Sequence, residues 1–109
     1  MRILAIEREL MTIYRPDLHD ILRVEAAAVW DLQRHDIIRD IWFTPTRRAI
    51  ILMECTGAVE ARTHLATLPL VHQGMSEFEV MELSAYDGYE RLFAAGLARP
   101  LAPAEPPEY

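Results

Sequence analysis

One carboxylate in the sequence falls where an apolar side chain is expected. Between residues 17 and 35 apolar residues recur at steps of three and four, which predicts one buried stripe of a helix: Leu18, Ile21, Leu22, Ala28, Val29 and Leu32. Glu25 lies at the centre of this stripe, one turn after Ile21 and one turn before Val29. A carboxylate there loses hydration, and this desolvation raises its pKa toward the range useful for a proton shuttle. The alternative is a structural carboxylate that is satisfied by an arginine or a tyrosine.

The expected strands offer a second group of candidate residues. Their alternation predicts one uniformly apolar face, which should meet the helices: Leu4, Ile6, Ile50, Leu52, Phe78 and Val80. The other face mixes carboxylates with large apolar side chains, as small-molecule pockets do, and includes Ala5, Glu7, Asp40, Trp42, Met53, Glu79 and Met81. If Glu7 and Glu79 lie close together on adjacent strands, one of them holds a proton at neutral pH, because nearby like charges resist ionising together. The alternative is that these carboxylates pair with Arg8, with Arg39 or with an arginine of a partner subunit.

Aromatic and histidine side chains are further candidates, each with a plainer interpretation. Trp42 can stack on a ligand, although a tryptophan on a sheet face more often fills an interface. His72 follows the Leu-Pro-Leu-Val turn and can sit at a pocket mouth or be an exposed loop histidine. Tyr14, Tyr86 and Tyr89 can gate an opening, or the last two can pack against a neighbouring subunit. The predicted substrate-binding residues are therefore Trp42, Met53, His72, Glu79 and Met81.

The elements that must position these residues follow from the same periodicities. Strands are predicted at residues 3–9, 37–43, 48–54 and 77–83. One helix runs from Asp17 to about His35. A second helix begins after Thr56, which can cap it, and is stopped by Pro69, because proline cannot continue a helix.

The C-terminal part of the chain has a different composition. A short helix is predicted over residues 87–95, ending at Gly96, and four of the seven prolines fall in the last ten residues. We therefore place one domain at residues 1–96 and an extended, mobile, proline-rich tail at residues 97–109.

The order strand, helix, strand, strand, helix, strand predicts an α+β, ferredoxin-like βαββαβ sandwich. Two right-handed crossovers and one hairpin then give a four-stranded antiparallel sheet with both helices on one face. The opposite face of that sheet is left bare, and its usual cover is a second copy of the chain. We therefore expect a homo-oligomer of two or more subunits.

Several stretches resemble the muconolactone delta-isomerase-like domain family. They are IIRDIWF, AIILMEC with the helix after it, HLATLPLVHQG and EFEVMELSAYDGYERLF, and the resemblance covers roughly residues 1–93. The ATLPLV turn at 66–71 and Trp42 are the most specific parts, whereas the first strand and the proline-rich tail depart from the family. The resemblance implies a dimeric α+β barrel and an acidic residue in the register of Glu25.

Composition and charge exclude several classes of protein. The 109 residues fit one domain, and an apolar fraction of 51% is enough for a core. A net charge of -6 argues against nucleic-acid binding, and the basic doublet Arg47–Arg48 is explained by a turn. Cys55 is the one cysteine, so neither an intrachain disulfide nor a cysteine-based metal site is expected, and the four histidines show no metal-binding spacing.

The beginning of the chain and its hydropathy indicate the compartment. The N-terminal stretch MRILAIERE carries charges where a signal peptide needs an unbroken apolar core. No apolar stretch approaches the roughly 20 residues that span a bilayer. We therefore expect a cytoplasmic protein with no membrane partner.

Two hypotheses of function remain open at this stage. The first is a cofactor-free enzyme that transfers a proton on a small organic acid, lactone or aromatic catabolite, with Glu25 as the base and Glu7 or Asp40 as the alternatives. The second is a non-catalytic ligand-binding or assembly protein of the same fold, because fold alone does not confer function. A haem- or metal-binding relative is a third interpretation, and no histidine is well placed to support it.

Overall fold

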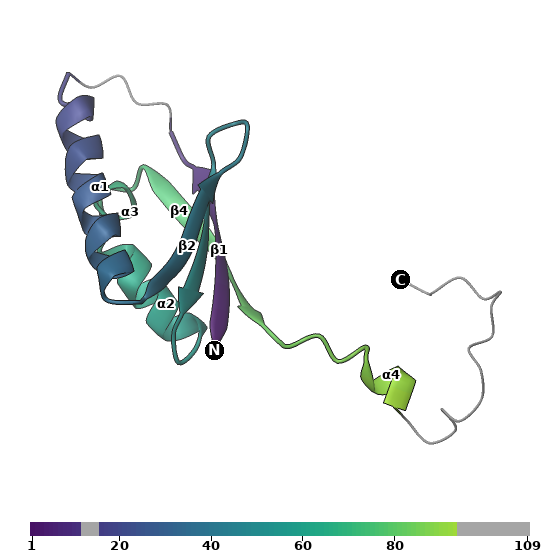
Figure 1. Cartoon of the computed structure of the whole chain (residues 1–109). Helices are drawn as coiled ribbons and strands as arrows, with labels where there is room; N and C mark the ends of the chain where they lie inside the picture. The colour runs from purple at the N-terminus through teal and green to yellow at the C-terminus, as the bar shows by residue number, and fades with distance from the viewer. Residues whose placement is uncertain (12–15, 94–109) are drawn as a thin grey trace.

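The structure is a computed structural model that describes residues 1–11 and 16–93. Its elements in chain order are β1 (Arg2–Glu9), α1 (Leu18–Arg34), β2 (Ile38–Phe43), β3 (Ala49–Glu54), α2 (Ala58–Ala66), α3 (Pro69–His72), β4 (Ser76–Leu83) and α4 (Glu90–Phe93). The four strands form one antiparallel sheet in the order β2-β3-β1-β4. Figure 1 shows α1, α2 and α3 on the same side of this sheet. This is the ferredoxin-like topology, and the predicted fold class is confirmed.

The first helix begins where the sequence predicts, but its apolar stripe is buried only in part. Asp17 occupies the N-cap position, and its backbone carbonyl accepts the N–H of Ile21 at 3.0 Å. Ile21 and Leu32 are buried, while the N-terminal half of the helix carries more exposed apolar residues, Leu22 among them. The helix therefore packs on the core through a few residues and leaves an open space beside the others.

The second helix begins one residue later than Thr56 suggests. Gly57 occupies the N-cap position, and the backbone N–H of Thr56 donates to the Glu60 carboxylate at 3.0 Å. The N–H of Ala58 is satisfied from another element, since it donates to the Glu82 carboxylate of β4 at 3.2 Å. Caps supplied by Glu60 and Glu82 replace the cap expected from Thr56.

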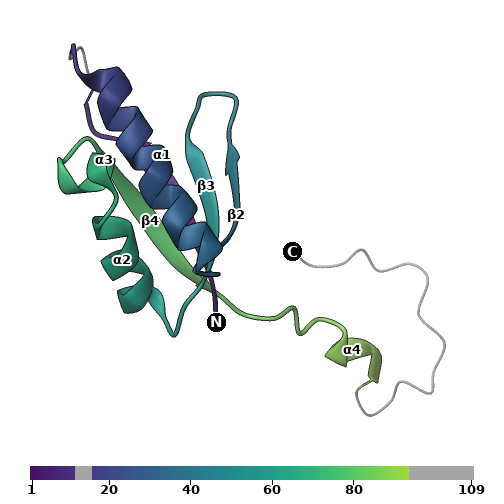
Figure 2. The same ribbon diagram turned by 60° about the vertical axis from the view of Figure 1, so that its left-hand side comes forward.

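A short helix, α3, follows α2 directly and was not predicted. Pro69 stops α2, as expected, but it is also the first residue of α3, after Leu68 in an extended conformation. Proline suits the first helical turn because its missing N–H would have no partner there. This short helix is important for the site, because α3 packs against α1 and places the backbone of Leu70 beside that helix (Figure 2).

The assignment of the two sheet faces was wrong. The core between helices and sheet contains Ile3, Ala5, Ile51 and Met53, together with apolar residues of α2 such as Leu65. The odd-numbered residues of β1 and β3 therefore face the helices, and Leu4, Ile6, Ile50 and Leu52 lie on the opposite face. Phe78 and Val80 do face the helices, because they pair with Glu7 and Ala5 of β1. Both sides of the central strands are apolar, so alternation alone cannot say which side is covered.

The sheet side without helices is called the open face below. Register places on it Leu4, Ile6, Asp40, Trp42, Ile50, Leu52, Glu79 and Met81. An irregularity between Ile38 and Asp40 in β2 lets Ile38 and Ile41 both face the helices while Asp40 and Trp42 face outward. Half of the Trp42 surface is exposed (50%) in this single chain.

The end of the described chain leads away from the sheet. After β4 the backbone extends outward to α4 (Figures 1 and 2). The tail at residues 97–109 and Tyr14 lie outside the described residues. In the described part of the chain, no helix is long and apolar enough to cross a membrane.

Candidate functional site

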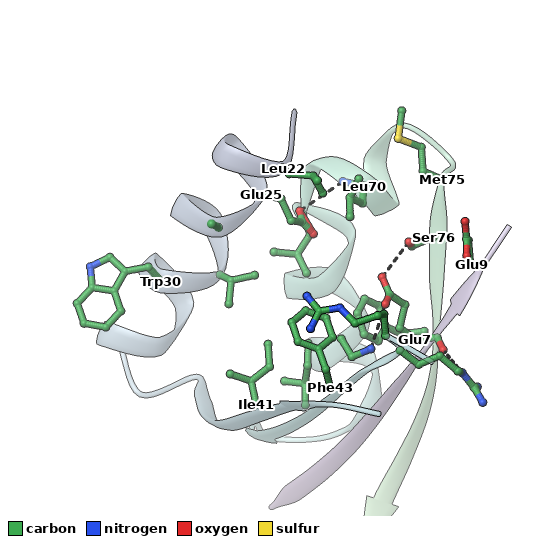
Figure 3. Close-up of a pocket in the computed structure, with 18 of the residues that line it drawn as sticks. Glu7, Glu9, Leu22, Glu25, Trp30, Ile41, Phe43, Leu70, Met75 and Ser76 are labelled. Carbon is green, nitrogen blue, oxygen red and sulfur yellow. Dashed lines mark hydrogen bonds between the residues drawn. The ribbon is translucent and has the colours of Figure 1, made fainter. Parts of the chain in front are cut away.

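A cavity of about 720 Å³ lies between α1 and the sheet, on the helix side. Its walls come from β1, α1, the β2–β3 hairpin, α3 and the start of β4 (Figure 3). Most of its lining is apolar, including Leu22, Val29, Ile41, Ile51, Leu70 and Phe78. The α1 side of the cavity runs along most of the helix, from Leu18 to Gln33, so the helix stands over the sheet without filling the space beneath it. The size of the cavity suits a ligand of one or two rings.

Glu25 reaches this cavity from α1. It is partly buried, and its Oε2 accepts the backbone N–H of Leu70 at 3.4 Å. Burial raises the pKa of the Glu25 carboxyl; the hydrogen bond from Leu70 opposes this rise and the negative charge of Glu7 adds to it. Among the described residues no arginine pairs with Glu25, so the carboxyl opens on a cavity and is not held in an ion pair.

Glu7 also lines the cavity, but it is held in place by three strands. Its Oε1 accepts the N–H of Ala49 at 3.0 Å, and its Oε2 accepts the hydroxyl of Ser76 at 2.9 Å (Figure 3). Its backbone carbonyl accepts the Nε–H of Arg48 at 2.9 Å. Glu7 is thus a fixed negative charge between β1, β3 and β4, whereas Glu25 is held by one long hydrogen bond.

Aromatic and basic side chains surround the mouth of the cavity. Trp30 of α1 and Phe43 of β2 are both more than half exposed and both line it. The guanidinium of Arg47 lies over the Phe43 ring, 4.0 Å from its centroid. The sequence interpretation missed these residues: it attributed Arg47 and Arg48 to a turn, which is correct for the backbone but ignores their side chains. The sequence did contain a signal for these basic residues, because the doublet Arg47–Arg48 lies at the turn of a predicted strand hairpin.

The structure brings together some of the predicted site residues and separates others. Glu7, a candidate from the strands, and Glu25, the candidate from the first helix, line the same cavity. Asp40, Trp42, Glu79 and Met81 lie on the open face, and Met53 is fully buried in the core. Glu7 and Glu79 lie on adjacent strands but not close together on one face, because Glu79 pairs with Ile6 and therefore points to the opposite side of the sheet from Glu7.

The remaining candidates lie away from the cavity. His72 is the last residue of α3, is exposed, and does not line the cavity. Tyr86 and Tyr89 contact each other edge-to-face, with ring centroids 4.9 Å apart, on the segment that leaves the sheet. Of the described residues, no three or more histidines, cysteines, aspartates or glutamates are grouped as ligands for a metal ion.

The arrangement suits proton transfer. A carboxyl whose pKa is raised keeps its proton to a higher pH than an ordinary glutamate does, which favours its use as an acid as well as a base. Glu25 has this property, it faces a largely apolar cavity, and a second carboxylate beside it helps to maintain the shift. The site therefore combines one carboxyl whose pKa is raised, Glu25, with one carboxylate held by hydrogen bonds, Glu7.

Comparison with known proteins defines the fold. No protein-family model matches the chain, and no curated protein matches its sequence. A solved structure that matches is the 5-chloro-2-hydroxyhydroquinone dehydrochlorinase TftG from Burkholderia phenoliruptrix AC1100, in complex with 2,5-dihydroxybenzoquinone. The match covers 81% of this chain and 98% of that one, with a TM-score of 0.58 and 14% sequence identity. At this identity the likeness shows that the two chains share a small α+β fold.

Proposed function

We propose that this protein is a cofactor-free enzyme that moves a proton on a small cyclic organic acid, lactone or aromatic catabolite. The observation that carries the proposal is the Glu25 carboxyl, which has a raised pKa and opens into an apolar cavity beside the fixed charge of Glu7. The dehydrochlorinase of similar fold, named for a chlorinated hydroquinone, supports an aromatic or quinonoid substrate. The resemblance of the sequence to muconolactone isomerase-like domains points to the same kind of chemistry.

Glu25 acts as the proton carrier in this proposal. A ligand ring in the cavity lies against the apolar lining, and the Glu25 carboxylate takes a proton from a carbon next to a carbonyl or enol oxygen. The acid form of Glu25 then returns the proton at another position of the same conjugated system. The N–H of Leu70 holds the carboxylate in its orientation. Burial raises the pKa of Glu25, and the negative charge of Glu7 adds to the rise, which favours the acid form.

The experiment is to replace Glu25 by glutamine and measure turnover and stability together. Muconolactone and 5-chloro-2-hydroxyhydroquinone are the two probe substrates, and Glu79→Gln on the open face is the matched control, since it makes the same change away from the cavity. We expect Glu25→Gln to lower kcat/KM about a hundredfold or more, the usual scale for the loss of a general base. We expect Glu79→Gln to leave turnover unchanged.

Stability tests the structural alternative for the same residue. If Glu25 has no cationic partner, glutamine removes a desolvated charge and the variant is at least as stable as the wild type at neutral pH. If Glu25 belonged to a buried ion pair, the same change would cost about 3 kcal/mol or more. A clear loss of stability, or full turnover by Glu25→Gln, would overturn the assignment of Glu25 as the base. Saturable binding of a probe without turnover by the wild type would favour the non-catalytic binding protein.

A further inference from the structure

Arg47 has an unusual backbone conformation at the mouth of the cavity. It lies between β2 and β3 with φ of 65°, and Asp36 and Arg47 are the non-glycine residues with positive φ in the described part of the chain. This left-handed region disfavours a residue with a Cβ, and glycine or asparagine would adopt it at lower cost. Retaining arginine there is a reason to ask what its side chain does.

The Arg47 side chain is placed but not neutralised. Its guanidinium lies over the Phe43 ring, which fixes its position beside the cavity. Among the described residues no carboxylate forms a salt bridge with it, whereas Arg8 and Arg34 each have an acidic partner. Arg48, its neighbour, donates its Nε–H to the backbone carbonyl of Glu7. Arg47 is therefore a pre-positioned cation whose planar set of N–H donors suits a carboxylate or a similar anion.

The charges inside the cavity decide which end of a ligand faces Arg47. Three carboxylates of the described chain, Glu7, Glu9 and Glu25, line the cavity and oppose an anion at their own positions. Of the described residues, Arg47 and Arg48 are the cations that line the same cavity, so an anionic ligand is favoured with its negative group beside them and its uncharged ring directed inward. A neutral ligand would gain less from Arg47, because its oxygens accept hydrogen bonds but carry no charge for the guanidinium to attract.

We infer that Arg47 is the residue that selects for charge, and that it binds the anionic group of a small cyclic acid whose ring occupies the cavity. This inference rests on the proposed function, because it names the substrate class of the same site. Arg47 holds the negative group while Phe43 and the apolar walls contact the ring, which leaves the far side of the ring toward Glu25.

The test uses two probes that differ in one charge. 2,5-Dihydroxybenzoate carries a carboxylate, and methyl 2,5-dihydroxybenzoate has the same ring and hydroxyl groups without the charge. Binding of each is measured by isothermal titration calorimetry to the wild type, to Arg47→Gln and to Arg47→Gly. Arg23→Gln is the matched control, because Arg23 is exposed on α1, does not line the cavity, and gives the same change in net charge.

The expected result is discrimination that depends on Arg47 alone. The wild type should bind the acid about tenfold more tightly than the ester, which is about 1.4 kcal/mol. Arg47→Gln should lose this preference, because it binds the acid more weakly and the ester as tightly as the wild type does. Arg23→Gln should keep the preference. Arg47→Gly should also lose it while remaining at least as stable as the wild type, because glycine adopts positive φ freely.

Several results would overturn the inference. They are equal binding of acid and ester by the wild type, no binding of either probe at millimolar concentration, or equal effects of Arg47→Gln and Arg23→Gln. Failure of the proposed function is a separate outcome: full turnover by Glu25→Gln would remove the proton-transfer proposal while the preference for the acid persisted. Conversely, the wild type could bind acid and ester equally while Glu25→Gln loses turnover. That result would overturn the inference about Arg47 and leave the proposed function in place.

Discussion

Replacing Glu7 tests whether the fixed carboxylate holds the floor of the cavity together. Its two carboxylate oxygens accept from Ala49, 42 residues away, and from Ser76, 69 residues away. One side chain thereby connects three strands of the sheet. Glu7→Ala removes both acceptors, and Glu7→Gln keeps the shape while removing the charge, so the pair of variants separates hydrogen bonding from charge.

The size of the effect follows from the burial of the two donors. Ala49 is 8% exposed and Ser76 is 6% exposed, so neither donor finds bulk water when the carboxylate is removed. A hydrogen bond to a charged group contributes about 1.5–3 kcal/mol. Water entering from the adjacent cavity recovers part of the loss, so we expect Glu7→Ala to lower the free energy of unfolding by about 2–4 kcal/mol.

Glu7→Gln should cost much less. The amide oxygen still accepts the N–H of Ala49, and the amide N–H₂ donates to the Ser76 hydroxyl, which rotates to accept it. We expect a loss of about 1 kcal/mol or less. Both variants should lower the pKa of Glu25, because the negative charge of Glu7 is one of the causes that raise it.

The assay is urea unfolding at pH 7, followed by tryptophan fluorescence at one fixed protein concentration, since association would make the midpoint depend on concentration. The pKa of Glu25 is measured by NMR titration of its side-chain carboxyl carbon. A loss below about 0.5 kcal/mol for Glu7→Ala, the range of an ordinary surface substitution, would refute the bridging role. Equal losses for the two variants would refute the separation of hydrogen bonding from charge.

Two further predictions concern pH and association. Because burial raises the folded-state pKa of Glu25, the stability advantage of Glu25→Gln over the wild type should be absent below the ordinary carboxyl pKa of about 4.3, should open as the pH rises, and should level off above the folded-state pKa. Urea midpoints from pH 3 to 8 that keep a constant difference would contradict this. The open face should be covered by a second copy of the chain, so light scattering should give at least twice the subunit mass of 12.5 kDa, and Trp42→Asp should favour the monomer. A stable mass of 12.5 kDa for the wild type at micromolar concentration would contradict association.

Local patterns were sufficient to predict the order and type of the main elements. The apolar stripe of α1 and the strand pattern from Ala49 to Glu54 place these elements within a residue or two of their observed bounds. Pro69 marks the end of α2, because its effect on the backbone is local. The same proline also begins α3, which the sequence interpretation missed, because a four-residue helix is too short to show a period.

The candidate site was predicted in part. Glu25 could be found from the sequence, because a charge within an apolar stripe is visible from the spacing of its own helix. Glu7 was chosen for the wrong reason, since it was assigned to the same sheet face as Glu79. In the structure the two residues lie on opposite faces of the sheet. Arg47 was interpreted only as a turn residue, because the contacts of its side chain depend on tertiary structure. In the structure its guanidinium lies over the Phe43 ring.

The sequence by itself determined the βαββαβ order and the position of Glu25 in its helix, since both depend on residues a few positions apart. Only the tertiary structure decided that Glu7 and not Glu79 faces α1, and that Arg47 lies over Phe43 beside the same cavity. The physical reason is that both sides of β1 and β3 are apolar, so either could have met the helices. The choice depends on how strands distant in the sequence pair and on which side the helices then cover.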